Sequence, residues 1–176
     1  MNSIIISAVG SDRPGIVSEI SGVITNHGGN VEESRMSRIG SDFAIIMLVS
    51  VTPEWMESLE VALQSIKELT IISKLTKRQE AKEDIRCQID LSGADNEGII
   101  KVLSKYLAGK SINILEMQTY ISNAPVAGTP LFNLNAMTAV PENLNIMDIQ
   151  FDLNKIAQKL GVEIIVSQSE YTTETA

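Results

Sequence analysis

The hydrophobic pattern of the first half of the chain switches between two periods. Residues 4–9 form an apolar run rich in β-branched side chains, and residues 43–51 are apolar at every second position, which is typical of strands. Between them, apolar residues recur at helical spacing over residues 16–24. The remaining elements of this half are a more polar strand, a second helix and a fourth strand, over residues 31–38, 53–66 and 71–75. The predicted order is βαββαβ.

The second half of the chain repeats the first. The segment Gly10-Ser-Asp-Arg-Pro-Gly-Ile-Val17 aligns with Gly93-Ala-Asp-Asn-Glu-Gly-Ile-Ile100 at an offset of 83 residues. Further along, Thr52-Pro-Glu54 falls on Val140-Pro-Glu142, where the offset is 88. Five extra residues are therefore expected in the second half, within the Pro-, Gly- and Ala-rich segment 123–130.

Read in this way, the second half gives the same order of elements, with strands over residues 86–92, 112–122, 130–139 and 162–169 and helices over residues 98–109 and 146–160. The predicted fold is α+β, with two tandem ferredoxin-like βαββαβ domains, each an antiparallel sheet with helices on one face. The domains span residues 1–80 and 86–170, with a linker at 78–85 and a tail at 171–176. Because each sheet leaves one face and two edges open, we expect the modules to pack against each other and the chain to form a homodimer.

The strand-to-helix turn of each half is the first candidate for a binding site. A glycine-containing turn that opens a helix presents free backbone N–H groups and the positive end of the helix dipole, which suit a carboxylate. Gly15 and Gly98 would allow a ligand to approach closely. A well-capped helix start explains the same residues, with Asp12 or Ser11 as the cap and Pro14 in the first turn. Both interpretations stay open.

Four other residues attract attention as candidate functional groups. Asn30 and Asn113 follow the first helix of each half. Each is either a residue of a left-handed turn or a side-chain amide that binds the polar ends of an amino acid. His27 is the only histidine, and a charge at the end of a helix is its favoured role. Cys87, the only cysteine, is expected at a buried strand position.

Composition excludes several classes of function. The net charge is −8, with 8 basic and 11 acidic residues in positions 1–83 and 6 and 11 in positions 84–176. Neither half has a basic stripe, so we expect no direct binding of nucleic acid. A single cysteine allows no internal disulfide and no multi-cysteine metal site. There is no phosphate loop, nucleophile elbow or zinc spacing, which predicts a protein without enzymatic activity, cofactor or metal. Without a secretory signal or a membrane-length apolar stretch, a cytoplasmic protein is expected.

The repeated turn also points to a known family. Two βαββαβ units, each with a Gly-x-Asp-x-x-Gly-Ile turn, resemble tandem ACT domains, the regulatory modules that sense amino acids. The segments Ser11-Asp-Arg-Pro-Gly-Ile-Val17 and His27-Gly-Gly-Asn-Val31 carry the resemblance most specifically. A chain of two such units resembles the glycine cleavage system transcriptional repressor family. That resemblance implies a regulator that senses a small amino acid, glycine or serine-like, and controls transcription of amino-acid metabolism genes. It would act through a transcriptional activator protein, without binding DNA itself.

In ACT domains the ligand commonly lies between two modules, so the resemblance also nominates ligand-binding residues. They are Asp12, Arg13, Pro14, Gly15, Ile16, Val17 and Asn30, and in the second copy Asp95, Asn96, Glu97, Gly98, Ile99, Ile100 and Asn113. In the second copy Asn96-Glu97 replaces Arg13-Pro14, and Glu97 would repel a carboxylate, which favours the turn at residues 12–17. The alternatives are a ligand-free ACT-type module for protein interaction or dimerisation that regulates an enzyme, and an enzyme or enzyme subunit.

Overall fold

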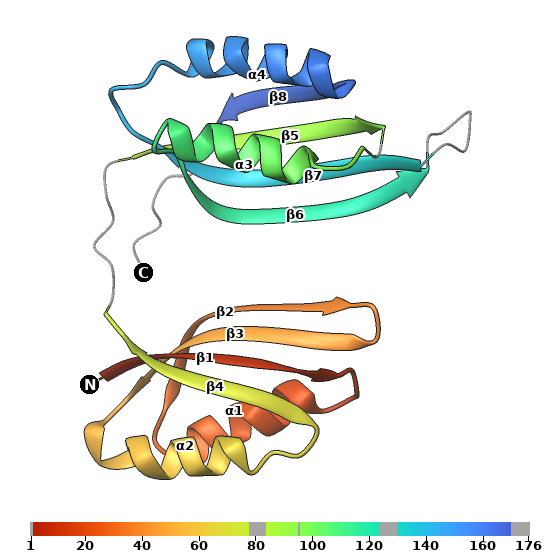
Figure 1. Cartoon of the computed structure of the whole chain (residues 1–176). Helices are drawn as coiled ribbons and strands as arrows, with labels where there is room; N and C mark the ends of the chain where they lie inside the picture. The colour runs from red at the N-terminus through yellow and green to blue at the C-terminus, as the bar shows by residue number, and fades with distance from the viewer. Residues whose placement is uncertain (1, 78–83, 95, 124–129, 170–176) are drawn as a thin grey trace. The chain divides into compact units, whose positions relative to one another are not determined.

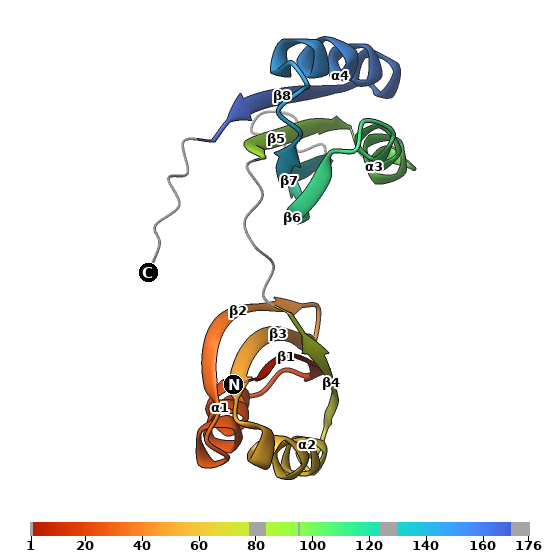
Figure 2. The same ribbon diagram turned by 90° about the vertical axis from the view of Figure 1, so that its left-hand side faces the viewer.

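The chain folds into two compact units, Met1–Glu80 and Ala81–Ala176 (Figure 1). The computed structural model describes residues 2–77, 84–94, 96–123 and 130–169, so the predicted tail and most of the predicted linker lie outside the described residues. In each unit, four antiparallel strands form one sheet, and two helices cover one face of it (Figure 2). The two units are called the first and the second module.

The first module has the predicted order of elements. They are β1 (Asn2–Ser11), α1 (Ile16–Asn26), β2 (Asn30–Ile39), β3 (Asp42–Val51), a short 3₁₀ helix (Pro53–Trp55), α2 (Met56–Gln64) and β4 (Leu69–Thr76). The strands lie in the order β2-β3-β1-β4, so the two central strands are the apolar ones at 4–9 and 43–51. The polar strand β2 is at an edge, where one side of its backbone remains open.

The second module repeats this arrangement. Its elements are β5 (Ile85–Ala94), α3 (Ile99–Gly109), β6 (Asn113–Asn123), β7 (Pro130–Val140), α4 (Ile146–Leu160) and β8 (Val162–Gln168). The strands lie in the order β6-β7-β5-β8, which is the order of the first module. The prediction of two tandem βαββαβ domains with antiparallel sheets is confirmed.

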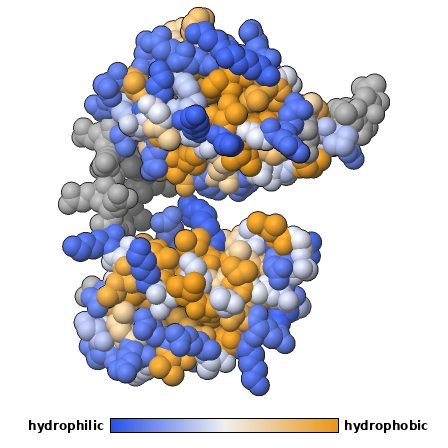
Figure 3. All heavy atoms as spheres, in the orientation of Figure 1, coloured by the Kyte–Doolittle hydropathy of each residue, from blue (hydrophilic) through white to orange (hydrophobic). Residues whose placement is uncertain are grey.

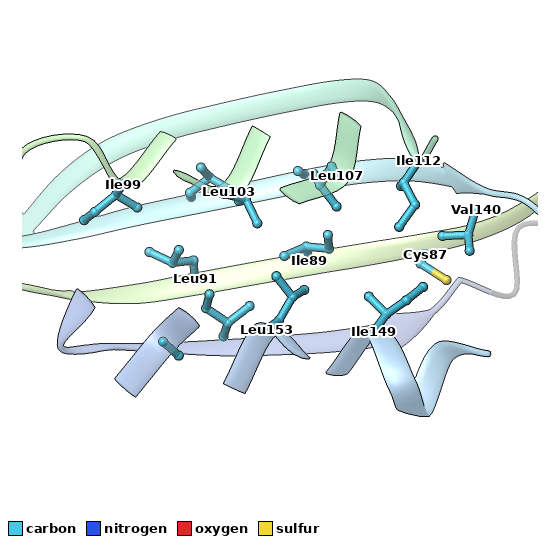
Figure 4. Packing of buried hydrophobic residues seen from close by; sticks show 14 residues of the cluster. Cys87, Ile89, Leu91, Ile99, Leu103, Leu107, Ile112, Val140, Ile149 and Leu153 are labelled. Atoms are coloured by element: carbon cyan, nitrogen blue, oxygen red, sulfur yellow. The ribbon is translucent and has the colours of Figure 1, made fainter. Parts of the chain in front are cut away.

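The core of each module lies between the sheet and its two helices. In the second module, Ile89 and Leu91 of β5 meet Leu103 of α3 and Leu153 of α4, and all four are at most 2% exposed (Figure 4). Side chains two positions apart on a strand, or four positions apart on a helix, lie on the same face. The apolar residues of the strands and helices therefore meet in this core. Cys87 is buried at the end of this cluster, as predicted, and burial raises the pKa of its thiol.

The strand register corrects the predicted length of the insertion. Asn2 pairs with Val51 in the first module, and Ile85 pairs with Val140 in the second. The first residues of these pairs are 83 positions apart, whereas the second residues are 89 apart. The second module therefore gains six residues between β6 and β7, where five were expected. The similarity of the two Pro-Glu sequences misplaced the alignment by one residue, because those residues lie beyond the strands.

The open faces of the two sheets, which point away from the helices, differ in chemistry. The first module carries apolar side chains at the centre of this face, which are Ile5, Val9, Ile46, Leu48 and Ile72. The equivalent positions of the second module are Gln88, Ser92, Asn135, Met137 and Ile165. Hydrophobic side chains also reach the surface elsewhere on both modules, as the orange atoms in Figure 3 show. The sequence pattern did not predict this difference between the sheets.

Candidate ligand-binding site

An open hollow of about 530 Å³ lies against the turn between β1 and α1. Its lining residues are Asp12, Arg13, Gly15, Ile16, Val17, Ser18, Ser21 and Phe43. Five of the seven ligand-binding residues predicted for the first module are in this set, and Pro14 lies in the same turn outside the lining. The structure thus brings most of the predicted first site together.

The floor of the hollow is the exposed start of α1. Gly15 precedes the helix with a φ of 94°, and no side chain in the described part of the chain accepts a hydrogen bond at this end. The first intrahelical bond runs from the N–H of Glu19 to the carbonyl of Gly15, at 2.8 Å. The N–H groups of the three residues before Glu19 therefore lack a partner within the helix, which is the usual basis of an anion site. The predicted side-chain cap by Asp12 or Ser11 is wrong.

Charges of both signs surround this helix start. The Arg13 guanidinium contacts the Glu19 carboxylate at 2.5 Å and the Glu68 carboxylate at 3.6 Å. The hydrogen bond to Glu19 raises the pKa of Arg13 above its ordinary value, so this side chain stays cationic. On the other side, Asp12 lies 3.7 Å from Arg38 of β2. These pairs are largely solvent-exposed, so each holds its partner only weakly.

The apolar part of the hollow comes from α1 and β3. Val17 is 40% exposed and Phe43 is half-buried, so both offer side-chain surface to a ligand. Ile16 is 2% exposed because its side chain enters the core, which leaves only its backbone for binding. Phe43, Ser18 and Ser21 were missed in the sequence. The two serines could have been found as an i, i+3 pair on the polar side of α1, whereas Phe43 reaches the site only through strand pairing.

The equivalent turn of the second module has the same backbone but different side chains. Gly98 precedes α3 with a φ of 86°, and among the described residues no side chain caps this helix either. Asn96 donates a hydrogen bond from Nδ2 to the carbonyl of Leu160, at 2.8 Å, and so holds the end of α4. Ile99 is buried in the core, and Asp95 lies outside the described residues. This turn therefore offers a ligand less than its counterpart does.

The structure does not place the two asparagines beside the turns of their own modules. Ser11, next to the first turn, pairs through β1 with Asp42, whereas Asn30 pairs with Ser50. Eight positions along β3 separate these partners, roughly 26 Å. In the second module Asn113 pairs with Ala139, likewise at the far end of β7. Within one module the asparagine and the turn are too far apart to contact the same small ligand, so a site formed by both would need residues from two modules. This combination stays a prediction.

His27 has a structural environment. Its Nδ1 lies 2.8 Å from the carbonyl of Val23, in the last turn of α1, and its ring meets the Trp55 ring edge-on at 6.1 Å between centroids. The imidazole thus provides a hydrogen-bond partner for one of the carbonyls that a helix end leaves free. Within residues 2–77, 84–94, 96–123 and 130–169, no group of three or more His, Cys, Asp and Glu side chains could hold a metal ion. None of the helices in these ranges is long and apolar enough to cross a membrane.

Comparisons with known proteins agree with this architecture. Residues 2–75 match the ACT domain family. Over 173 residues, which are 96% of this chain and 91% of the other, the sequence is 21% identical to the glycine cleavage system transcriptional repressor of Escherichia coli K12. A crystal structure of an unknown protein from Galdieria sulphuraria is 32% identical, with a TM-score of 0.82 over 96% of this chain and 98% of that one. A crystal structure of a candidate glycine cleavage system transcriptional repressor is 22% identical, with a TM-score of 0.72 over 97% and 98% of the two chains.

Proposed function

We propose that this chain, whose residues 2–75 are an ACT domain and whose second half repeats that fold, senses a small amino acid and controls transcription through a protein partner. A regulatory role fits both the ACT domain and the sequence relationship to a transcriptional repressor. The specific ligand we propose is glycine, with serine as the next candidate. We assign the sensing to the hollow beside α1, because it combines the groups that a free amino acid needs.

The observation that carries the proposal is the presence of both charges around a free helix start. A free amino acid at neutral pH has a carboxylate and an ammonium group two bonds apart. The N–H groups that open α1, together with Arg13, suit the carboxylate. The Asp12 carboxylate lines the hollow, and the Glu19 carboxylate contacts Arg13 beside it, so both suit the ammonium group. Ligands with only one of these charges satisfy half of the site.

The open shape of the hollow explains why a second surface is needed. A volume of about 530 Å³ is several times larger than glycine, and the hollow opens to solvent. A small ligand would therefore stay largely hydrated until another surface covered it. Ligand binding then favours the arrangement in which the second surface covers the hollow. By stabilising this arrangement, the ligand changes the affinity of the chain for a protein partner. The ion pair between Arg13 and Glu19 must also rearrange to admit a carboxylate.

The partner is proposed to be a transcriptional activator rather than DNA. The chain has a net charge of −8, so it is repelled by the phosphate backbone at a distance. We propose that the protein regulates genes of amino-acid metabolism without catalysing a reaction itself.

Calorimetric titration with free amino acids tests the proposal. Wild-type protein should give saturable heat with glycine or serine. Val17→Glu should weaken binding at least tenfold, because it places a carboxylate at the surface that receives the ligand carboxylate. Ile100→Glu is the matched control, since Ile100 occupies the equivalent helix position of the second module and is 44% exposed. Affinity should remain at the wild-type level in that variant.

The result that contradicts the proposal is a flat titration for the wild-type protein across all free amino acids. The chain would then act as a ligand-free interaction module. Equal loss in Val17→Glu and Ile100→Glu would also overturn the assignment to the first turn, because it would show that the first module alone does not form the site.

A further inference from the structure

We propose that the chain forms a two-fold symmetric homodimer by packing the open sheet face of the first module against the same face of a second copy. This inference does not depend on amino-acid binding. It rests on the pattern of apolar and charged residues across that face, which is complementary to itself. The same pattern fixes the direction of the symmetry axis.

The centre of the face is apolar and solvent-exposed. Ile46 is 47% exposed, Val9 is 50% exposed and Ile72 is 65% exposed, and they lie on three adjacent strands. Ile5 and Leu48 pair with each other two positions further along the same face. Single exposed hydrophobic residues are common, but a continuous patch on a sheet face usually marks an interaction surface.

Strand register arranges the face as three rows that run across the sheet from β2 to β4. The rows are Glu33–Leu48–Ile5–Lys74, Arg35–Ile46–Ser7–Ile72 and Ser37–Ala44–Val9–Thr70. The first row begins with an acidic residue at one edge of the sheet and ends with a basic residue at the other. In this row Leu48 and Ile5 lie between the two charged residues.

A two-fold axis parallel to the strands makes this row complementary to itself. Such an axis places β2 of one copy over β4 of the other, so Glu33 faces the second copy's Lys74 and the reverse pair forms at the opposite edge. An axis perpendicular to the strands would place β2 over β2 and leave Lys74 opposite Thr70. The perpendicular axis therefore forms no pair of opposite charges between Glu33 and Lys74, so the axis parallel to the strands is favoured.

The size of the facing side chains also suits the axis parallel to the strands. In the second row Ile46 faces the small Ser7 of the other copy, and in the third row Val9 faces Ala44. Large residues opposite small ones allow two sheets to interdigitate at their usual separation of about 10 Å. In the second row Arg35 would lay its aliphatic stem over Ile72, while its guanidinium keeps the contact to Glu33 at 3.2 Å.

The area of the face is sufficient for a weak to moderate dimer. A four-stranded sheet with ten-residue strands is about 19 Å wide and 33 Å long, which is roughly 600 Å² per copy. Two copies would bury about 1,200 Å², the lower end of the range for specific interfaces. This area suits a dimer whose population depends on concentration rather than an obligate one.

The open face of the second module is a poor partner for this apolar surface. Its polar side chains are tied into a network, in which Asp90 accepts hydrogen bonds from Gln88 at 3.0 Å and from Asn135 at 2.5 Å. On the next row Ser92 donates to Asn133 at 3.1 Å. Covering these groups with isoleucine and valine would remove water from a carboxylate and gives no new hydrogen bonds in return. A second copy of the first face would cover the Ser7 hydroxyl but no carboxylate at the centre of the face.

Sedimentation velocity over a range of concentrations tests the dimer. Wild-type protein should shift from monomer to dimer, and Ile46→Thr should raise the dissociation constant at least tenfold while keeping a β-branched residue in the strand. The matched control is Val61→Thr, because Val61 is 65% exposed on α2, outside the sheet. That variant should dimerise as the wild type does. A wild-type chain that stays monomeric at high concentration, or an equal effect of both variants, overturns the proposal.

Charge reversal tests the symmetry axis. Glu33→Lys and Lys74→Glu each place like charges together at both edges of the dimer and should each weaken association about tenfold. The double variant restores opposite charges and should return the dissociation constant to near the wild-type value. Failure of the double variant to recover would contradict the axis parallel to the strands. Circular dichroism of each variant verifies that the sheet itself is retained.

Discussion

At the scale of single residues, two glycines define the helix starts of the duplicated fold. Gly15 and Gly98 have φ angles of 94° and 86°, in the left-handed region that side chains with a Cβ rarely adopt. A Cβ added at either position would find none of the described atoms outside its own chain neighbours within 4 Å. Glycine is therefore required by the backbone and not by crowding. The open space above Gly15 is part of the proposed ligand site.

Gly15→Ala should consequently destabilise the protein, by about 1–2 kcal/mol, because alanine is strained at positive φ. Gly22→Ala is the matched control, since Gly22 lies inside the same helix with no atom near its Cβ. That change should stabilise the protein by up to about 1 kcal/mol, as alanine favours helices. Urea unfolding measures both. Similar effects of the two substitutions would contradict this account of Gly15.

The turn residues predicted to bind a ligand have different surroundings in the two modules. The turn sequence indicated a carboxylate site, and its residues gather around one hollow. Asn96 is predicted to contact the ligand, and its amide donates a hydrogen bond to the end of α4. No local pattern could show this, because the two groups are 64 positions apart in the sequence. Likewise, strand pairing alone brings Phe43 to the first turn.

At the scale of secondary-structure elements, α4 begins where a side chain caps it. Asn145 accepts a hydrogen bond from the N–H of Met147 at 2.8 Å, and this is the only one of the four α-helix starts in the described residues with a side-chain cap. Asn145→Ala should cost about 1 kcal/mol of stability, whereas Asn145→Asp should retain the cap and the stability. Equal thermal unfolding of the alanine variant and the wild type would contradict a stabilising cap.

The contact between α3 and α4 should be visible in the titration of one tyrosine. Burial, and then the neighbouring charge of Asp152, raises the pKa of Tyr106 to about 12 from an ordinary value of 10.0. Since the folded state favours the neutral phenol, this contribution to stability is present below pH 10 and is lost as the pH rises through about 12. Absorbance near alkaline pH should show one late-titrating tyrosine that disappears in Tyr106→Phe. A tyrosine that titrates near pH 10 at this position would contradict the buried contact.

Most of the elements could be predicted because each has one dominant period. The apolar run of β1 and the apolar residues at every second position of β3 indicated strands. The helix predicted over residues 146–160 is observed as α4 with those bounds. The register between strands was harder to predict, since a one-residue error in the insertion leaves every local pattern intact. The chemistry of the open sheet faces was not predicted at all. Whether a polar residue on a strand lies at an edge or at the centre depends on strand order, which periodicity does not specify.

At the scale of the whole molecule, the net charge distinguishes a regulator that acts through a protein partner from one that binds DNA directly. With a net charge of −8, the purified protein should not retard duplex DNA at physiological salt. Gel retardation across a range of salt concentrations is the measurement. A complex whose affinity falls steeply with added salt would show phosphate contacts and would contradict the proposed mechanism.

Binding of a free amino acid at the start of α1 is tested most directly by amide chemical shifts during a titration with glycine. We expect saturable shifts at the backbone N–H groups of Ile16, Val17 and Ser18, with weaker changes at the equivalent turn of the second module. These amides lie at the helix start that lacks a side-chain cap. No saturable shifts with any free amino acid, or shifts confined to another part of the chain, would contradict it.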